Sequence, residues 1–84
     1  MGLFIDINDN LYCSIVTSHV VIKKSLYASM ESSSTTVAGI SGSSGLSSNK
    51  LDHPYGIFVD INFDLYVADQ YNNRIQLFKP GQLN

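Results

Sequence analysis

Cys13, His19 and His53 are the side chains in this sequence that offer the soft or imidazole ligands preferred by zinc. Zinc sites in small domains usually draw their ligands from short spacings along the chain, such as two cysteines or two histidines within a few residues. No two of these three residues stand at such a spacing, and a single cysteine excludes a disulfide within the chain. The sequence therefore predicts no metal site, no internal disulfide and no cofactor.

Oxygen ligands and nucleophiles are more numerous, but they do not form a catalytic pattern. Asp60, Asn62 and Asp64 alternate as the first ligands of a calcium loop do, yet the glycine and the distant glutamate of an EF-hand are missing. Gly42-Ser-Ser-Gly is only a broken version of the Gly-x-Ser-x-Gly motif. Spacing alone leaves a glycosidase-type pair of carboxylates open. We interpret the alternating residues as turn formers and expect no catalytic residue.

The composition is that of a β-rich globular segment with room for only a small core. The chain has 84 residues, of which 44% are hydrophobic and 14% are charged, and its formal net charge is -2. Its basic residues are dispersed apart from the pair Lys23 and Lys24, which does not favour a nucleic-acid partner. No apolar run approaches the roughly 20 residues that span a bilayer, so we expect no membrane partner. The cellular compartment stays open.

An internal repeat is the strongest guide to the fold. Residues 2–11 read GLFIDINDNL and residues 56–65 read GIFVDINFDL, and the two segments align without a gap. The copies begin at Gly2 and Gly56 and are therefore 54 residues apart. This period is slightly longer than the roughly 40 to 50 residues of a common propeller blade, and the excess lies in a serine-rich connection.

Each copy alternates between apolar and polar residues in short runs separated by Asn- and Asp-rich turns, a pattern typical of antiparallel strands. The sequence thus predicts an all-β fold of antiparallel four-stranded blades, about two in number. The second blade lacks its outer strand, because Lys79-Pro80-Gly81 ends the last run. The expected strands are 3–6, 11–15, 19 to about 26 and 35–38 in the first copy, and 57–60, 65–68 and 74–79 in the second.

The serine-rich segment 29–48 allows two interpretations. Its nine serines and three glycines suit a flexible linker. The apolar pair Val37 and Ala38 argues instead for an outer strand, followed by a Gly/Ser loop that crosses to the next blade. We favour the second interpretation.

The second copy closely resembles the NHL repeat, a repeat of β-propeller proteins. The resemblance rests on Asp52-His-Pro-Tyr-Gly-Ile-Phe-Val-Asp, then Leu65-Tyr-Val-Ala-Asp, then Asn72-Asn-Arg-Ile-Gln, and it covers nearly all of residues 51–79. It implies a partial NHL-type β-propeller. The expected parts are a degenerate NHL-like blade over 1–39, a Gly/Ser-rich inter-blade loop over 40–55 and an incomplete NHL-like blade over 56–84.

The resemblance also implies a structural role in the blade for five residues: Gly56, Asp60, Asp69, Asn73 and Arg74. Asp69 and Arg74 flank a turn, so we expect them to satisfy each other and nearby backbone groups. The first copy has Ile15 and Val20 in their places, which predicts a looser first blade.

Five tyrosines supply aromatic surface, and we assign most of them to packing within the blades, since tyrosine suits strands. Tyr55 lies beside Pro54, and Tyr71 lies in a turn. These two tyrosines are the ones that we expect to contact a ligand or partner.

The leading functional hypothesis is an NHL-repeat scaffold that binds a protein or ligand without catalysis of its own. The resemblance also allows two alternatives. One is a fragment of a propeller enzyme such as a peptidyl-amidating-lyase-like metal-dependent lyase, and the other is an RNA-binding NHL propeller, which needs a basic face. Open blades carry unpaired strand edges, so the sequence also predicts self-association.

Overall fold

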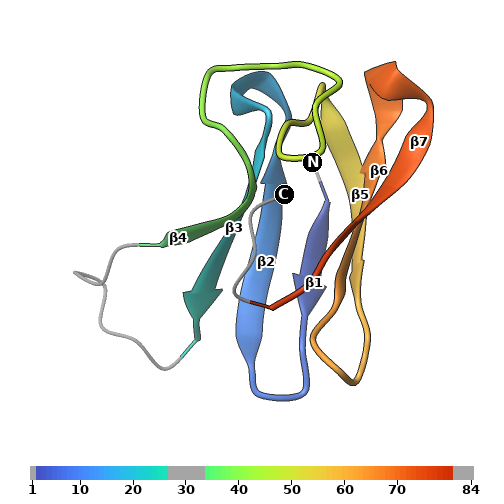
Figure 1. The fold of residues 1–84 in the computed structure, drawn as a ribbon. Helices are drawn as coiled ribbons and strands as arrows, with labels where there is room; N and C mark the ends of the chain where they lie inside the picture. Colours follow the sequence, from blue (N-terminus) through green and yellow to red (C-terminus); the bar gives the residue numbers. More distant parts are fainter. Residues whose placement is uncertain (1, 27–33, 81–84) are drawn as a thin grey trace.

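Seven β-strands form two antiparallel sheets in the computed structural model, which describes residues 2–26 and 34–80 (Figure 1). These residues contain no α-helix, and no helical segment among them is long and apolar enough to cross a membrane. The predicted all-β fold, a four-stranded sheet followed by a three-stranded one, is confirmed. The strands are β1 (Leu3–Ile5), β2 (Asn10–Ile15), β3 (Val20–Ser25) and β4 (Thr35–Gly39) in the first sheet, and β5 (Pro54–Val59), β6 (Leu65–Asp69) and β7 (Arg74–Phe78) in the second.

Each sheet is a meander in which every strand pairs with its neighbour along the chain. We call the sheet β1-β2-β3-β4 blade 1 and the sheet β5-β6-β7 blade 2. Residues 27–33 and 81–84, which include part of the serine-rich segment and the expected end of the second blade, lie outside the described residues.

Three strands begin at other residues than the sequence predicts, and for β2 the difference is a single residue, Asn10 instead of Leu11. β5 starts at Pro54, because a proline is tolerated as the first residue of a strand, and its pairing with β6 shifts register between Pro54 and Ile57. β3 starts at Val20, because His19 has a left-handed backbone with φ 60° and closes the preceding turn, η1 (Val16–Ser18).

The Asp-Ile-Asn sequence that the two copies share builds the same hairpin turn twice. Asp6 Oδ1 accepts hydrogen bonds from the backbone N–H groups two and four residues later, at 2.9 and 3.0 Å. Asp60 Oδ1 accepts the equivalent bonds at 2.9 and 3.0 Å. Each carboxylate therefore holds a turn between the first two strands of its blade, as short Asp side chains commonly do.

A second turn is also repeated, although the residue at its end differs. In blade 2 the turn is η2 (Gln70–Asn72), and it is followed by Asn73 with φ 53° and ψ 46°. The corresponding residue in blade 1 is His19, with φ 60° and ψ 39°. Asn and His are both enriched in this left-handed region, so the same backbone is built from two different side chains.

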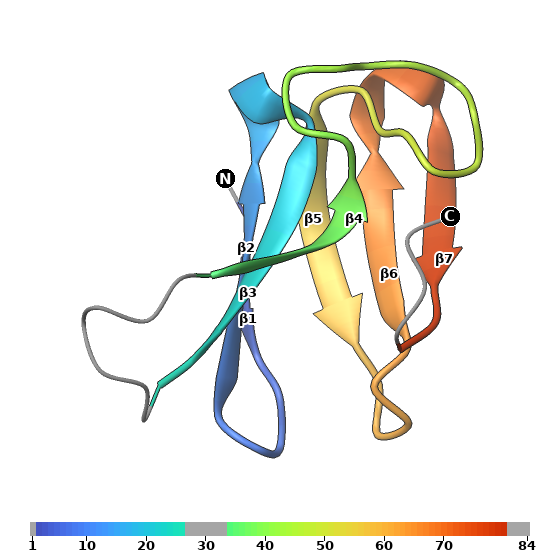
Figure 2. The same cartoon turned by 60° about the vertical axis from the view of Figure 1, so that its left-hand side comes forward.

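The two blades lie face to face, with β5 against β1 and β2 (Figure 2). Tyr12 and Ser14 are buried along β2, and Leu65 and Val67 are buried along β6. Because side chains alternate between the two faces of a sheet, the Tyr12 face of blade 1 packs on the Leu65 face of blade 2. The core consists of Tyr12, Val21, Ala38, Leu51, Val59, Leu65, Val67 and Phe78.

Residues 40–53 connect β4 to β5 and cross the same end of both sheets (Figures 1 and 2). The side chain of Leu51 anchors this connection in the core, where it is completely buried. The backbone N–H of Gly45 donates to the carbonyl of Leu51 at 3.3 Å, which closes the connection into a compact loop.

The blades are in close contact at Gly2. Its backbone N–H donates to Ser14 Oγ at 2.7 Å, and the Ser14 hydroxyl donates to the carbonyl of Tyr55 in the other blade at 2.7 Å. A Cβ atom at Gly2 would collide with that carbonyl oxygen. At the equivalent Gly56 a Cβ atom would meet only Ala68 Cβ at 3.7 Å, an ordinary contact.

We expect the replacement Gly2→Ala to destabilise the chain by about 1–3 kcal/mol, because the added methyl group forces the blades apart. Gly56→Ala, the matched control, should change the free energy of unfolding by less than about 1 kcal/mol, since its site is open. Urea unfolding followed by circular dichroism at low protein concentration measures both. Equal losses in the two variants would contradict this account of the blade contact.

Candidate functional site

A buried carboxylate, that of Asp69, organises the junction between blade 2 and the connection 40–53. Its residue is 0% exposed. Oδ1 accepts a hydrogen bond from the backbone N–H of Asp52 at 2.6 Å, and Oδ2 accepts one each from the side chains of Asn72 and Arg74 at 2.8 Å. These three donors, one of them a guanidinium group, offset the cost of removing the charge from water.

Arg74 directs its remaining donors at backbone carbonyls of the connection. Nη1 donates to Leu46 at 2.9 Å, and Nη2 donates to Ser47 at 3.3 Å and to Lys50 at 3.0 Å. A planar guanidinium group with five donors is suited to such multiple contacts. Because these donors face the chain's own backbone, Arg74 holds the connection in place and is not a free site for an anion.

Asn72 has a role that the sequence does not predict. Its amide Nδ2 donates to Asp69 Oδ2 and, at 2.9 Å, to the carbonyl of Gly45. Asn73, the residue named from the motif, supplies the left-handed backbone after η2. Asn72 and Asn73 both tolerate this backbone and both carry an amide side chain. The sequence alone therefore does not say which of them ends the turn and which one donates to Asp69.

Blade 1 has no counterpart of this arrangement at the equivalent positions, where Ile15 and Val20 replace the acid and the arginine. Its buried charge is instead Asp6, which is 6% exposed. Asp6 Oδ2 accepts hydrogen bonds from the Tyr12 hydroxyl at 2.9 Å and from Asn10 Nδ2 at 3.1 Å.

Burial and hydrogen bonding compete at this carboxylate. Burial alone raises the pKa of Asp6, but the hydrogen bonds from Asn10, Tyr12 and Asn8 together outweigh it, and the pKa lies below its usual range. For the Tyr12 hydroxyl the two influences act in the same direction. Burial, and then the hydrogen bond to the Asp6 carboxylate and its negative charge, raise the pKa of Tyr12.

His19, Asp52 and His53 meet where the connection passes between the two blades. One ligating atom from each lies within 4.8 Å of the others. The two histidines are 34 residues apart, so their spacing along the chain does not predict this group. The group forms because the connection returns across blade 1. The third soft side chain, Cys13, is not a member of it.

The two tyrosines expected to contact a ligand are both exposed, Tyr55 by 50% and Tyr71 by 61%. The Tyr71 ring stacks on His53 with 3.8 Å between ring centroids. Tyr55 instead holds the blades together through its backbone carbonyl. Their role in ligand contact stays a prediction.

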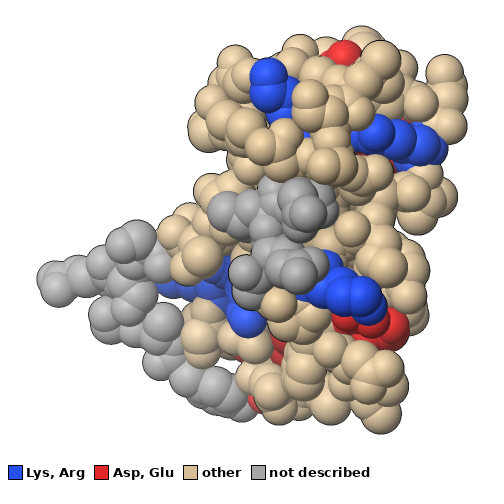
Figure 3. Space-filling model, in the orientation of Figure 1, with Lys and Arg blue, Asp and Glu red and all other residues tan. Residues whose placement is uncertain are grey.

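Charged side chains are dispersed on the face shown in Figure 3, where Lys and Arg stand at separate places. One lysine, Lys79, lies with Nζ 3.6 Å from Asp64 Oδ2. Another, Lys23, lies with Nζ 5.8 Å from the centre of the Tyr12 ring. The large basic stripe that a phosphate backbone requires is not visible on this face.

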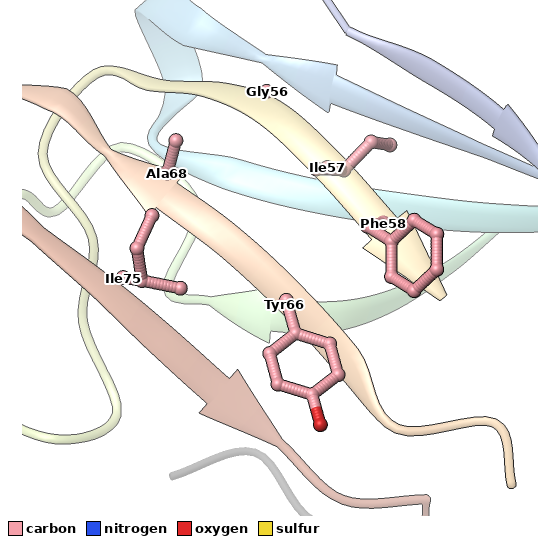
Figure 4. A pocket seen from close by; sticks show the side chains of 6 residues that line it. All are labelled: Gly56, Ile57, Phe58, Tyr66, Ala68 and Ile75. Atoms are coloured by element: carbon pink, nitrogen blue, oxygen red, sulfur yellow. The ribbon is translucent and has the colours of Figure 1, made fainter. Parts of the chain in front are cut away.

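The outward face of blade 2 carries an apolar hollow (Figure 4). Ile75, which lines this hollow, is 68% exposed. In the repeat, Tyr66, Ala68 and Ile75 of blade 2 correspond to Tyr12, Ser14 and Val21 of blade 1. The three residues of blade 1 are 4%, 0% and 0% exposed, in that order, because blade 2 covers them. The hollow is lined by Gly56, Ile57, Phe58, Tyr66, Ala68 and Ile75.

Comparison with known proteins finds similarity over less than half of the chain. No protein-family model matches. The chain is 54% identical over 39 residues to the E3 ubiquitin-protein ligase TRIM71 of Bos taurus and to that of Gallus gallus, and 51% identical over 39 residues to that of Rattus norvegicus. These matches cover 46% of this chain and 4 to 5% of the relatives. The chain therefore spans a small part of the length of the curated relatives that it matches.

We expect Arg74→Lys to lower the free energy of unfolding by about 1–3 kcal/mol, because a lysine keeps the charge but loses the planar set of donors that binds the connection. Lys79→Gln is the matched control, since its pair with Asp64 is a surface ion pair worth less than about 1 kcal/mol. Limited proteolysis should cut the connection 40–53 faster in Arg74→Lys alone. Identical proteolysis of both variants would show that Arg74 does not hold the connection.

Stability should depend on pH through Asp6. Its folded pKa lies below the unfolded value of about 3.9, so the ionised group stabilises the fold above that value, and this contribution is lost as the pH falls through the folded pKa. Asp6→Asn should lower the free energy of unfolding by about 1–3 kcal/mol at neutral pH. This difference from the native chain should become smaller as the pH falls to about 2. Thermal unfolding across this pH range measures the difference. A constant difference would exclude the ionised form as the source of the stability.

Proposed function

We propose that this chain is a segment of an NHL-type β-propeller scaffold that binds a protein partner and has no catalytic activity of its own. Support comes from the motif over 51–79, from two meander sheets packed face to face, and from the similarity to TRIM71 over 46% of the chain. Repeat folds of this kind build binding surfaces from the loops of several units. Ligase activity is not part of the proposal, because the shared segment is 4 to 5% of those proteins.

The observation that carries the proposal is the pair of free faces on the two blades. Blade 2 leaves its Tyr66 face open, and blade 1 leaves open the face that bears Leu3 and Ile5, which are 59% and 53% exposed. These two free faces are the repeat counterparts of the two faces already packed together inside the chain. Blade 1 of another molecule would therefore pack on the open face of blade 2. This contact would have the same geometry as the packing of blade 2 on blade 1 within one chain.

The partner that we assign to the open face of blade 2 is thus a second copy of this chain, bound head to tail. Such a contact uses different surfaces on the two molecules, so it extends to further copies or closes into a ring. Ring closure would bring the inter-blade connections of several copies to one end of the assembly, where propellers bind their partners.

The variants Ile75→Lys and Leu3→Lys should each abolish assembly of the purified chain, because each places a charge in one of the two free faces. Light scattering coupled to size-exclusion chromatography measures the molar mass. The native chain should form oligomers in a concentration-dependent way. Ile61→Lys is the matched control, since Ile61 is 74% exposed in a hairpin turn and belongs to neither face.

Mixing the two variants distinguishes a head-to-tail contact from other association. Ile75→Lys retains the blade 1 face and Leu3→Lys retains the blade 2 face, so the mixture should form a one-to-one dimer that neither variant forms alone. A native chain that stays monomeric at all concentrations, or a mixture that does not pair, would refute the assembly.

An RNA partner is the weaker candidate. The dispersed lysines and the net charge of -2 give the chain no electrostatic basis for tracking phosphates.

A further inference from the structure

We propose that His19, Asp52 and His53 form a binding site for one divalent transition-metal ion of the zinc type, which links the two blades. The inference is independent of the face-to-face assembly described above. His19 ends the turn before β3 in blade 1, whereas Asp52 and His53 lie at the entry to β5 in blade 2. An ion held by all three would join parts of the chain that are far apart in sequence.

Two of the three separations between the ligand atoms are close to those that a tetrahedral ion requires, and the third is at most 4.8 Å. Asp52 Oδ1 lies 2.7 Å from His53 Nδ1 and 3.7 Å from His19 Nδ1. Ligands at about 2.0–2.1 Å from zinc stand about 3.3–3.4 Å apart, so the two measured separations lie on either side of the ideal value. Movements of about 1 Å or less at these atoms would bring both contacts to ideal separation.

The hydrogen bonds show which nitrogen atoms offer a lone pair. His19 Nδ1 accepts a hydrogen bond from the backbone N–H of His53 at 3.1 Å, so this nitrogen carries no hydrogen. A carboxylate oxygen only accepts, so His53 Nδ1 donates its hydrogen to Asp52. When the ion binds, it takes the place of the backbone N–H at His19 Nδ1 and of the Nδ1 hydrogen of His53 at Asp52. The His53 hydrogen then moves from Nδ1 to Nε2.

Neighbouring groups hold the three ligands in place. The backbone N–H of Asp52 is fixed by the buried Asp69 carboxylate, and its backbone carbonyl accepts from the N–H of Tyr71 at 3.1 Å. The Tyr71 ring covers one face of His53. Both histidines have left-handed backbones, with φ 60° and 55°. Such support around a metal ligand is typical of real sites.

The ligand set and its surroundings define the class of ion. Two imidazoles and one carboxylate suit Zn²⁺, Ni²⁺ or Cu²⁺ rather than Mg²⁺ or Ca²⁺, which prefer oxygen ligands alone. The three side chains are 15%, 27% and 31% exposed in the order His19, Asp52, His53, so an ion can enter and can keep water at a fourth position.

The test uses the whole 84-residue chain without a polyhistidine tag, carrying Cys13→Ser so that its free thiol cannot bind the ion. Calorimetric titration with Zn²⁺ should give one ion per chain and raise the thermal midpoint of unfolding. Co²⁺ should give the visible absorption bands of a site with nitrogen and oxygen ligands. Both readouts are independent of any catalytic activity.

His19→Asn is the decisive variant, because Asn73 adopts the same backbone in blade 2 and the replacement should preserve the turn. His19→Asn and His53→Asn should each weaken Zn²⁺ binding by at least about tenfold. The control Asp64→Asn, outside the group, should bind Zn²⁺ as the parent does. Circular dichroism without metal confirms that each variant is folded. No Zn²⁺ binding up to millimolar concentration, or equal affinity in His19→Asn and its parent, would overturn the proposal.

Discussion

The buried carboxylate of Asp69 is the group on which the arrangement of blade 2 and its connection depends. It binds the backbone of Asp52 directly, and through Arg74 it binds three carbonyls of the connection. A charge that is completely buried must have all its partners in place, since the interior offers no water to replace them. The turn η2, the connection and the start of β5 are therefore fixed relative to one another by a single charged group.

The two blades share a backbone but use it differently at the positions that face a neighbour. Gly2 and Ser14 of blade 1 contact Tyr55 of blade 2, whereas the matching Gly56 and Ala68 border an open hollow. A repeat can keep one set of strands and turns while its faces adapt to what covers them, because strand pairing is a backbone property and face packing is a side-chain property. The free faces of both blades follow from this geometry, and so does the contact that we assign to them.

Local features of the structure could be predicted from sequence, and long-range contacts could not. Alternation and the Asp-Ile-Asn turns located the strands, because hairpins are built from neighbouring residues. The first residues of β5 and β3 differ from the prediction because of the backbone conformation at Pro54 and His19. The pattern of apolar and polar residues does not indicate this conformation. The role of Asn72, beside the named Asn73, was also hidden, because it depends on where the connection passes.

What the sequence by itself determined is the repeat, its strand order and the residues that turn the chain, since these depend on neighbours within a few positions. Only the tertiary structure brought His19 to Asp52 and His53 and left the Tyr66 face uncovered. Both results come from the connection, which returns from β4 across the end of blade 1 and sets β5 beside β1 and β2. A contact between residues 34 positions apart follows from the packing of two sheets, and no local pattern of residue types encodes it.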